Sequence, residues 1–510
     1  MLEEERKYEV DPRFAVPDLS GCLPDGGAIV AAPPAPLRAT YYDTADRRLA
    51  RAGVSLRFRR GDPLPWTVKL PTGVVGVRQE ISRAGLPATI PAELVALVTA
   101  YTRGSALEPA AVLRTTRRVY ELRDRAGRLL AELDDDTVAV LDGPKTRLKF
   151  REIEVERHDG GRKLLDRVDE ALRTAGARNG GGFVPKHVRA LGKLGPPELT
   201  PPAPALSRKA CAGDVVIRAL RTDIARMLSY DPLVRLREPL PDGDTAVHQM
   251  RVGIRRLRTD LRTFRPLLNP LWANELRIEL SWLADRLGAA RDAEVLRARL
   301  RRTAAADPLA ALDDAAVARL DADLAARHED ALTALDAALD SARYRVLLDH
   351  LIAAAATPKV HPDRAAVPAP EILPRLVAKP WRQLAFGSDG VSGAGSLDAL
   401  APDDEWHAVR IRAKRARYAT EAVADVLGGA AAELAKAVAA VQTLLGDHQD
   451  AAVAAQTWLA IAHADPDDHA LAVTAGRLYE RERTAVRRAR DRFPAVWEKA
   501  DRRRLTGWLP

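Results

Sequence analysis

The sequence has little cysteine, few aromatic residues and no long apolar run. Its 510 residues include two cysteines, Cys22 and Cys211, which match no CxxC or zinc-binding spacing. We therefore expect a reducing compartment and no structural disulfide. A run of about 18 apolar residues, as a membrane span needs, is absent. The acidic N-terminal residues lack the apolar core of a signal peptide. These absences predict a cytoplasmic protein without a membrane partner.

Aromatic residues make up only 5% of the chain, so base-stacking surfaces for nucleic acid are poorly supported. Hydrophobic residues account for 47% and charged residues for 29%, which is typical of globular protein. The length indicates two or three domains. A net charge of +9 and a pI near 9.6 favour a polyanionic partner.

The first ten residues, MLEEERKYEV, alternate charged side chains in a way that suits a strand. Every second side chain of a strand points to the same face, so Glu3, Glu5 and Lys7 would lie together. Two close carboxylates repel unless a cation neutralises them, and Mg²⁺ is commonly held by carboxylates and phosphate oxygens. The alternative is a solvated N-terminal arm.

Residues up to about 200 show alternating runs that predict strands. The runs lie at 39–44, 54–60, 66–70, 76–82, 112–123, 128–134 and 150–156, with short helices expected at 90–103 and 162–175. Many antiparallel strands with short connections indicate a barrel or a sandwich.

Several of these strands alternate apolar residues with charges of both signs. Arg57 and Arg59 share one face, as do Thr67 and Lys69, and 152–156 places three glutamates on one face. On an open sheet such a face would be the solvent face. If the sheet closes with these charges inward, a polar tunnel results, and such a tunnel fits metal-bound phosphates.

The ordered set of charged motifs resembles the CYTH domains, the triphosphate tunnel metalloenzymes. Glu3-x-Glu5-x-Lys7 is similar to their signature, and YYDTADRRLARAGVSLRFRR is similar to their second block. Pro185 stands where the family usually has Ser before the lysine. Further matching positions are Arg57, Arg59, Lys69, Glu80, Arg114, Arg117 or its neighbour Arg118, Glu132, Glu152, Glu154 and Lys186.

The resemblance implies an antiparallel barrel with a metal-dependent triphosphatase site. The implied catalytic residues are Glu3, Glu5 and Lys7. The implied ligands of Mg²⁺ or Mn²⁺ are Glu3, Glu5, Glu80, Glu132, Glu152 and Glu154. The implied substrate-binding residues are Arg57, Arg59, Lys69, Arg114, Arg117 and Lys186. Inorganic triphosphate is the leading substrate. The alternatives are an organic triphosphate, as in thiamine triphosphatases and adenylate cyclases, or a barrel that binds with little turnover.

A proline-rich spacer at 195–206 separates domain 1–196 from a predicted all-α domain at 206–505. Helical spacing of Ala, Leu, Arg and Asp replaces the strand pattern there. A second proline-rich segment, 357–372, divides this half in two. Long helices are expected near 208–230, 246–267, 272–302, 308–355, 371–386, 404–427, 431–463 and 466–498.

The two helical parts repeat each other: HQMRVGIRRLRTDLRTF at 248–264 aligns with HAVRIRAKRARYATEAV at 407–423. LGAARDAEVL at 287–296 likewise aligns with LGDHQDAAVA at 445–454. On a helix the basic positions of each segment fall within an arc of roughly 80°. A solvated helix face is the alternative, but such faces normally mix signs. The stripes comprise His248, Arg251, Arg255, Arg258 and Arg262, and His407, Arg410, Lys414 and Arg417, and the further matched basic positions Arg256 and Arg415 are also candidate polyphosphate ligands.

This half resembles the CHAD domain, the conserved-histidine α-helical domain. The resemblance implies two pseudo-symmetric four-helix bundles around a basic channel that binds inorganic polyphosphate, with the stripe residues as ligands. It also implies an association with polyphosphate granules. Guanidinium groups on a rigid helix suit regularly spaced phosphate oxygens. Inorganic triphosphate and polyphosphate are thus the expected partners, and the sequence indicates no oligomeric state.

Overall fold

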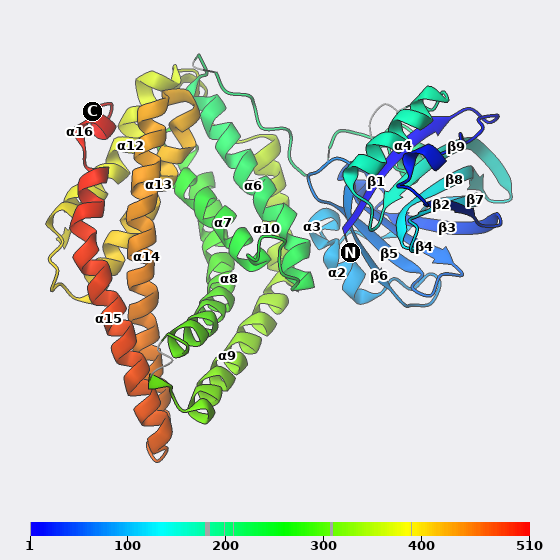
Figure 1. The fold of residues 1–510 in the computed structure, drawn as a ribbon. Helices are drawn as coiled ribbons and strands as arrows, with labels where there is room; N and C mark the ends of the chain where they lie inside the picture. The colour runs from blue at the N-terminus through cyan, green and yellow to red at the C-terminus, as the bar shows by residue number, and fades with distance from the viewer. Residues whose placement is uncertain (1, 179–183, 198, 208, 307–309, 389) are drawn as a thin grey trace. The chain divides into compact units, whose positions relative to one another are not determined.

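The computed structural model describes residues 2–178, 184–197, 199–207, 209–306, 310–388 and 390–510 (Figure 1). They form two compact units, Met1–Glu198 and Leu199–Pro510. Residues 1, 198, 208, 308 and 309, which fall within predicted segments, lie outside the described residues. In the described ranges, we find no helix with the length and hydropathy of a membrane span.

Eight antiparallel strands of the first unit close into a barrel, which confirms the predicted fold class. The strand order is β7-β3-β4-β5-β6-β1-β9-β8, and β8 pairs with β7. The short β2 (Ala28–Ala31) pairs with β7 beyond the end of β3. The barrel strands are β1 (Leu2–Val10), β3 (Ala35–Asp43), β4 (Ser55–Arg60), β5 (Trp66–Pro71), β6 (Val77–Arg83), β7 (Glu108–Arg123), β8 (Leu129–Asp142) and β9 (Lys145–Arg157).

An apolar core lies on the outer face of this barrel. Tyr8, Ile153 and Val155 project outward and pack with the buried face of α4 (Arg162–Thr174), which includes Leu165 and Val168. Because successive side chains of a strand alternate, the charged neighbours of these residues point inward. The helix therefore accounts for the polar interior, since it covers the apolar side of β1 and β9.

Short helices complete the unit: α1 (Arg48–Arg51), α2 (Ala92–Leu97), α3 (Thr99–Thr102) and α5 (Lys186–Leu191). The helix predicted at 90–103 is two pieces, α2 and α3, which meet at Val98. The sequence did not predict β2, α1 or α5, because elements of four to six residues are too short to show a periodic pattern.

The second unit is all-helical apart from a two-stranded hairpin, β10 (Gly387–Ser388) and β11 (Val391–Ser392). Its longer helices are α6 (Ala212–Leu236), α7 (Ala246–Thr263), α8 (Pro270–Ala304), α9 (Asp314–Asp340), α10 (Ala342–Ala356), α12 (Ala369–Phe386), α13 (Asp403–Leu427), α14 (Gly429–Ala464) and α15 (His469–Ala500). Short helices α11 (Pro362–Ala365) and α16 (Arg503–Thr506) follow α10 and α15.

The prediction of a single helix over 308–355 is wrong, because the structure has two helices there, α9 and α10, which are separated at Ser341. The Ser341 hydroxyl accepts the Tyr344 amide at 3.2 Å and so caps the new helix α10. Thr245 caps α7 in the same way, and Asn269 caps α8. The repeated helices meet, since α7 packs against both α8 and α13, and α13 packs against α14.

Candidate functional site

The strand β1 lies between β6 and β9 and presents Glu3, Glu5 and Lys7 to the barrel interior. Glu3 and Glu5 are only 7% and 6% exposed. Glu4 points the other way and pairs with Arg157 at 2.8 Å. This placement excludes a solvated arm, because both edges of β1 are hydrogen-bonded within the barrel.

One ion-pair group lies around Lys69. Its Nζ is 2.7 and 2.5 Å from the two Glu3 oxygens and 3.0 Å from a Glu80 oxygen. Burial raises the pKa of Glu3 even though Lys69 opposes the shift. Burial also opposes ionisation of Glu80, but Lys69 and Arg57 bring its pKa below the usual value. Lys69 therefore keeps two close carboxylates together.

A second group lies around Lys186, the first residue of α5. Its Nζ is 2.9 Å from Asp136 and 3.1 Å from Glu152, and it also contacts Glu154. Lys7 contacts Glu154 from β1. Burial opposes ionisation of Glu154, yet Lys186, Lys7 and Arg117 hold its pKa well below the usual value. The cations therefore keep this buried carboxylate ionised.

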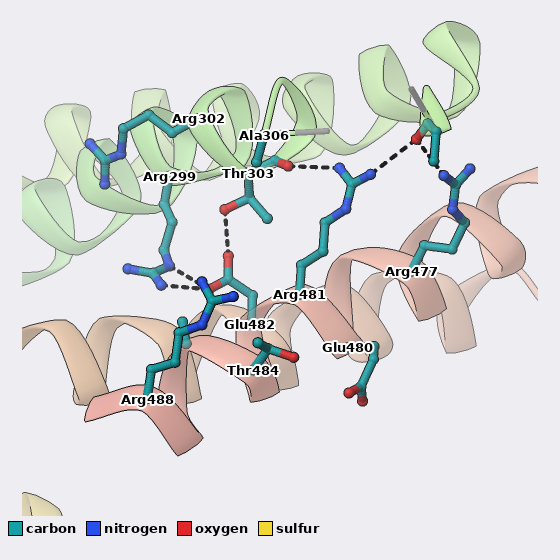
Figure 2. A pocket seen from close by; sticks show the side chains of 12 residues that line it. Arg299, Arg302, Thr303, Ala306, Arg477, Glu480, Arg481, Glu482, Thr484 and Arg488 are labelled. Atoms are coloured by element: carbon teal, nitrogen blue, oxygen red, sulfur yellow. Dashed lines mark hydrogen bonds and ion pairs between the residues drawn. The ribbon is translucent and has the colours of Figure 1, made fainter. Parts of the chain in front are cut away.

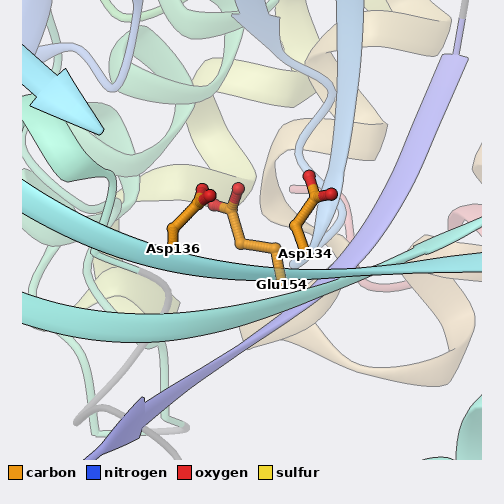
Figure 3. Close-up of side chains that lie close together, drawn as sticks. All are labelled: Asp134, Asp136 and Glu154. Atoms are coloured by element: carbon orange, nitrogen blue, oxygen red, sulfur yellow. The ribbon is translucent and has the colours of Figure 1, made fainter. Parts of the chain in front are cut away.

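Asp134, Asp136 and Glu154 form a compact acidic cluster. One ligand oxygen from each lies within 4.8 Å of the others, and Figure 3 shows the side chains projecting to the same side of β8 and β9. Burial, together with Asp136, Glu132 and Glu154, raises the pKa of Asp134 to about 8. Its Oδ1 has no hydrogen-bond partner among the described residues. The donor set fits a hard divalent cation, which would satisfy that oxygen and favour ionised Asp134.

Arg117 contacts this cluster, and its guanidinium lies 2.7 Å from Asp136 and contacts Asp134. Arg114 and Arg118 are exposed on the outer face. The prediction that Arg114 lines the tunnel is therefore wrong. Positions three apart in a strand face opposite sides, so Arg114 and Arg117 cannot share the interior. The structure selects Arg117 over Arg118.

The remaining predicted barrel residues are spread along the interior. Arg57 hydrogen-bonds Tyr41, whereas Arg59 pairs with Asp62 at 2.5 Å. Glu132 is opposite Glu156 in the register of β8 and β9. Burial, together with Glu3, Glu5 and Glu132, raises the pKa of Glu156 to about 7. Of the six predicted metal ligands, only Glu154 belongs to the compact cluster.

Sequence reasoning missed several residues of the interior. Asp134 and Asp136 alternate with Glu132 in ELDDD, so the period of two could have found them. His187 gives no such signal, because it lies in the short helix α5. Its ring stacks on Tyr41 with centroids 5.1 Å apart, and burial, with Arg78 and Lys7 nearby, lowers its pKa to about 3. His187 is therefore neutral.

Eleven residues surround a cavity of about 40 Å³ in the barrel. The lysine–carboxylate pairs explain why this cavity is small, because Lys7, Lys69 and Lys186 all reach toward acidic side chains on other elements. The cavity residues are Glu5, Lys7, Tyr41, Ser55, Arg57, Lys69, Arg78, Glu154, Pro185, Lys186 and His187.

The helical unit has a basic cavity of about 290 Å³, called here the central cavity. It is lined by equivalent residues of the two sequence repeats. The equivalent pairs are His248/His407, Arg251/Arg410, Arg255/Lys414, Arg291/Gln449, Asp292/Asp450 and Val295/Val453, with Leu296 in addition. Because each pair comes from matching positions on α7/α13 and α8/α14, the two stripes meet at one site.

Charge in the central cavity is largely positive. Arg251 pairs with Asp292 at 3.1 Å, and its equivalent Arg410 lies 3.8 Å from Asp450. Burial and the neighbouring arginines lower the pKa of Lys414 to about 6. Burial and Arg291 lower the pKa of His248. Such depressed values indicate cations that lack sufficient counter-charge.

The other predicted polyphosphate ligands are not in the lining of the central cavity. Arg256 and Arg417 pair with Glu421 at 2.5 and 2.6 Å. Arg258, Arg262 and Arg415 lie close to Arg277. Burial, together with repulsion from the three neighbouring arginines, lowers the pKa of Arg262 to about 10. The predicted ligands therefore divide into cavity-lining, ion-paired and clustered residues.

A closed barrel with an interior of paired carboxylates and cations has the triphosphate-tunnel fold. Comparison with known families agrees: the CYTH domain matches residues 1–177, and the CHAD domain matches residues 218–459. The chain belongs to the family of proteins that join a CYTH domain to a CHAD domain. CYTH tunnel enzymes depend on a metal ion, and the buried acidic cluster is suited to hold one.

The chain is similar over 98% of its length to Uncharacterized protein Rv2226 of Mycobacterium tuberculosis strain H37Rv, with 33% identity and 96% of that protein covered. Uncharacterized protein MT2285 of Mycobacterium tuberculosis strain CDC 1551 is 32% identical, and the match again covers 98% of this chain and 96% of that protein. Among solved structures, PptA from Streptomyces chartreusis is 26% identical, covers 57% of this chain and 100% of its own, and has a TM-score of 0.45. The CHAD domain of the plant Ricinus communis is 24% identical, with coverage of 57% and 95% and a TM-score of 0.41.

Proposed function

We propose that the CYTH barrel hydrolyses inorganic triphosphate, or a related triphosphate, with Mg²⁺ or Mn²⁺, and that the CHAD domain binds inorganic polyphosphate. One observation carries the proposal. The barrel interior places lysines and arginines directly against an acidic cluster that fits a divalent cation. A cytoplasmic location beside polyphosphate granules follows from this proposal.

Ligand binding would exchange the internal ion pairs. Lys186 and Lys7 now neutralise Glu154, and Lys69 neutralises Glu3. If divalent cations take over the carboxylates, these ammonium groups become available to phosphate oxygens. Lysine suits this exchange, because its long stem lets the charge move without a backbone change. The exchange also explains how a small cavity could accommodate a triphosphate.

The chain's own residues would act by holding and orienting the phosphates. Arg57 and Arg117 offer planar guanidinium groups, which bind phosphate oxygens in a fixed geometry. Lys7, Lys69 and Lys186 would neutralise charge from several strands. The barrel walls exclude bulk water, which strengthens each of these interactions. A bound metal ion would add Lewis-acid polarisation of the terminal phosphoryl group.

Polyphosphate binding by the CHAD domain is supported by the central cavity. Two helices, α7 and α13, direct basic side chains from both repeats into one space. Lys414 and His248 have lowered pKa values there, so an anion would relieve unfavourable charge. A regular chain of phosphates suits such a space, because it offers several anionic groups at short intervals.

The direct test is phosphate release from inorganic triphosphate, ATP, thiamine triphosphate and long-chain polyphosphate, with Mg²⁺ and with Mn²⁺. Fastest turnover of inorganic triphosphate supports the proposal. Preference for ATP or thiamine triphosphate would favour the organic-triphosphate alternative. No turnover of any substrate, with polyphosphate binding retained, would favour a binding protein with an inactive barrel.

A further inference from the structure

A groove of about 640 Å³ lies between α8 and α15, apart from the central cavity (Figure 2). Arg299 and Arg302 line it from α8, and Arg477, Arg481 and Arg488 line it from α15. None of these arginines belongs to the repeated stripes. The groove is therefore a second basic surface that the repeat pattern did not predict.

The two glutamates of the groove already have cationic partners. Glu482 is 1% exposed and binds Arg299 at 2.7 and 2.6 Å, with the Thr303 hydroxyl at 2.8 Å. Glu480 pairs with Arg487, which is not in the groove lining. Both glutamates of the groove lining are therefore already engaged.

Main-chain carbonyls hold two of the groove arginines in place. Arg481 donates to the Thr303 carbonyl at 2.9 Å and to the Ala310 carbonyl at 3.0 Å. Arg477 donates to the Ala311 carbonyl at 2.8 Å. A carbonyl orients a guanidinium group without removing its charge. The groove therefore has positive charges that are positioned before any ligand binds.

Arg302 and Arg488 are exposed, and the described residues provide no carboxylate partner for either. Along α15, Arg477, Arg481, Thr484 and Arg488 follow one helix face. With a rise of 1.5 Å per residue, the first and last of these are about 16 Å apart along the helix. That length exceeds one phosphate group and matches an extended anion.

We propose that this groove binds a segment of an inorganic polyphosphate chain, as a second site beside the central cavity. The inference extends the proposed polyphosphate binding of the CHAD domain. Arg291 of the central cavity and Arg299 of the groove both lie on α8, about 12 Å apart along its axis. One long chain can therefore reach both sites, whereas triphosphate cannot occupy the two at once.

The groove lining favours polyphosphate over nucleic acid. Its described residues include no aromatic side chain on which a base could stack. Ala306 and Ala485, which also line the groove, carry only methyl side chains. Guanidinium groups from two helices can bind phosphate oxygens through paired hydrogen bonds.

The test compares two double variants of the full-length protein by titration with end-labelled long-chain polyphosphate. Arg302→Ala with Arg488→Ala should weaken binding about tenfold and reduce the salt slope by about 1.4, since two phosphate contacts are lost. Arg286→Ala with Arg492→Ala is the matched control, because both residues are exposed on the same helices outside the groove. The control variant should lose only the small part of the polyphosphate affinity that follows from its two fewer positive charges.

Equal weakening in the two double variants would overturn the proposal. Loss of single-stranded DNA binding with polyphosphate affinity unchanged would also overturn it and assign the groove to nucleic acid. Combining the groove substitutions with Arg255→Glu and Lys414→Glu distinguishes binding in the groove from binding in the central cavity. Residual long-chain binding in that background, removed by the groove substitutions, supports a second site. Unchanged residual binding after the groove substitutions would contradict it.

Discussion

The Lys186 ammonium lies 2.9 Å from an oxygen of Asp136, a residue with no exposed surface. Lys186 begins α5, whereas Asp136 lies in the middle of β8. The same ammonium also contacts Glu152 and Glu154. A single short helix thus delivers one positive charge that three buried carboxylates share.

Removal of that charge should destabilise the barrel. Lys186→Ala leaves the three carboxylates without their common partner, and we expect the free energy of unfolding to fall by about 3–5 kcal/mol. Denaturant unfolding of the full-length protein measures this loss. Lys193→Ala is the control, because Lys193 is exposed in the segment after α5. Equal stability of the two variants would contradict the ion-pair role.

Glu5→Gln should reduce triphosphate turnover by at least about a hundredfold, because it removes a carboxylate from the tunnel. Glu4→Gln is the matched control, since Glu4 points outward and pairs with Arg157 and Arg162. Initial rates of phosphate release with Mg²⁺ measure both variants. Unchanged turnover in Glu5→Gln would overturn the assignment of the catalytic tunnel.

Charge reversal in the central cavity should remove most of the polyphosphate binding and leave only the part that the α8–α15 groove provides. Arg255→Glu and Lys414→Glu place two anions where the repeats meet, while the barrel should continue to hydrolyse triphosphate. Binding should also weaken steeply with salt in the unmodified protein, because counterions are released. If reversal of two arginines outside both basic sites, Arg286 and Arg492, weakens long-chain binding equally, the central cavity has no specific role.

Polyphosphate binding should be accompanied by proton uptake at Lys414. The pKa of Lys414 is about 6, so the side chain is mostly neutral at pH 7 in the free protein. A polyanion favours the charged form, so affinity should fall as pH rises above 6, by up to about tenfold per unit. Calorimetry in two buffers of different ionisation enthalpy measures the uptake. Lys414→Met should remove it, whereas Lys436→Met, on the exposed face of α14, should not.

The buried carboxyl pair Asp223 and Asp260 should make stability fall with rising pH. Burial raises the pKa of Asp223 to about 7, and that of Asp260 well above its usual value. The folded state therefore binds more protons, and its stabilisation is complete below about pH 4 and is lost as pH rises through 7. The slope should approach 1.4 kcal/mol per pH unit for each proton released.

Asp260→Asn should flatten this dependence, because the amide can donate a hydrogen bond at every pH. Denaturant unfolding at pH 5.5 and pH 8 provides the comparison. Asp330→Asn, at an exposed position of α9, should leave the slope unchanged. A steep slope retained in Asp260→Asn would show that other groups cause it.

The sequence by itself determined the features that depend on local period. Alternation in β1 separated Glu3, Glu5 and Lys7 from Glu4, and helical spacing identified the two basic stripes. Both inferences succeed because side-chain direction in a regular element follows from the backbone repeat. The all-helical half followed from the same patterns, whereas the strand pattern left a barrel or a sandwich and the resemblance to the CYTH domains implied the barrel.

Tertiary structure alone decided which residues meet. The register of β8 and β9 places Asp134 opposite Glu154 and Asp136 opposite Glu152, and packing of α5 brings Lys186 and His187 into the barrel. Helix packing likewise separated the cavity-lining stripe residues from those that pair elsewhere, and created the α8–α15 groove. These contacts join residues far apart in the chain, so no local period contains them. Their energies depend on burial and neighbouring charge, which exist only after the chain has folded.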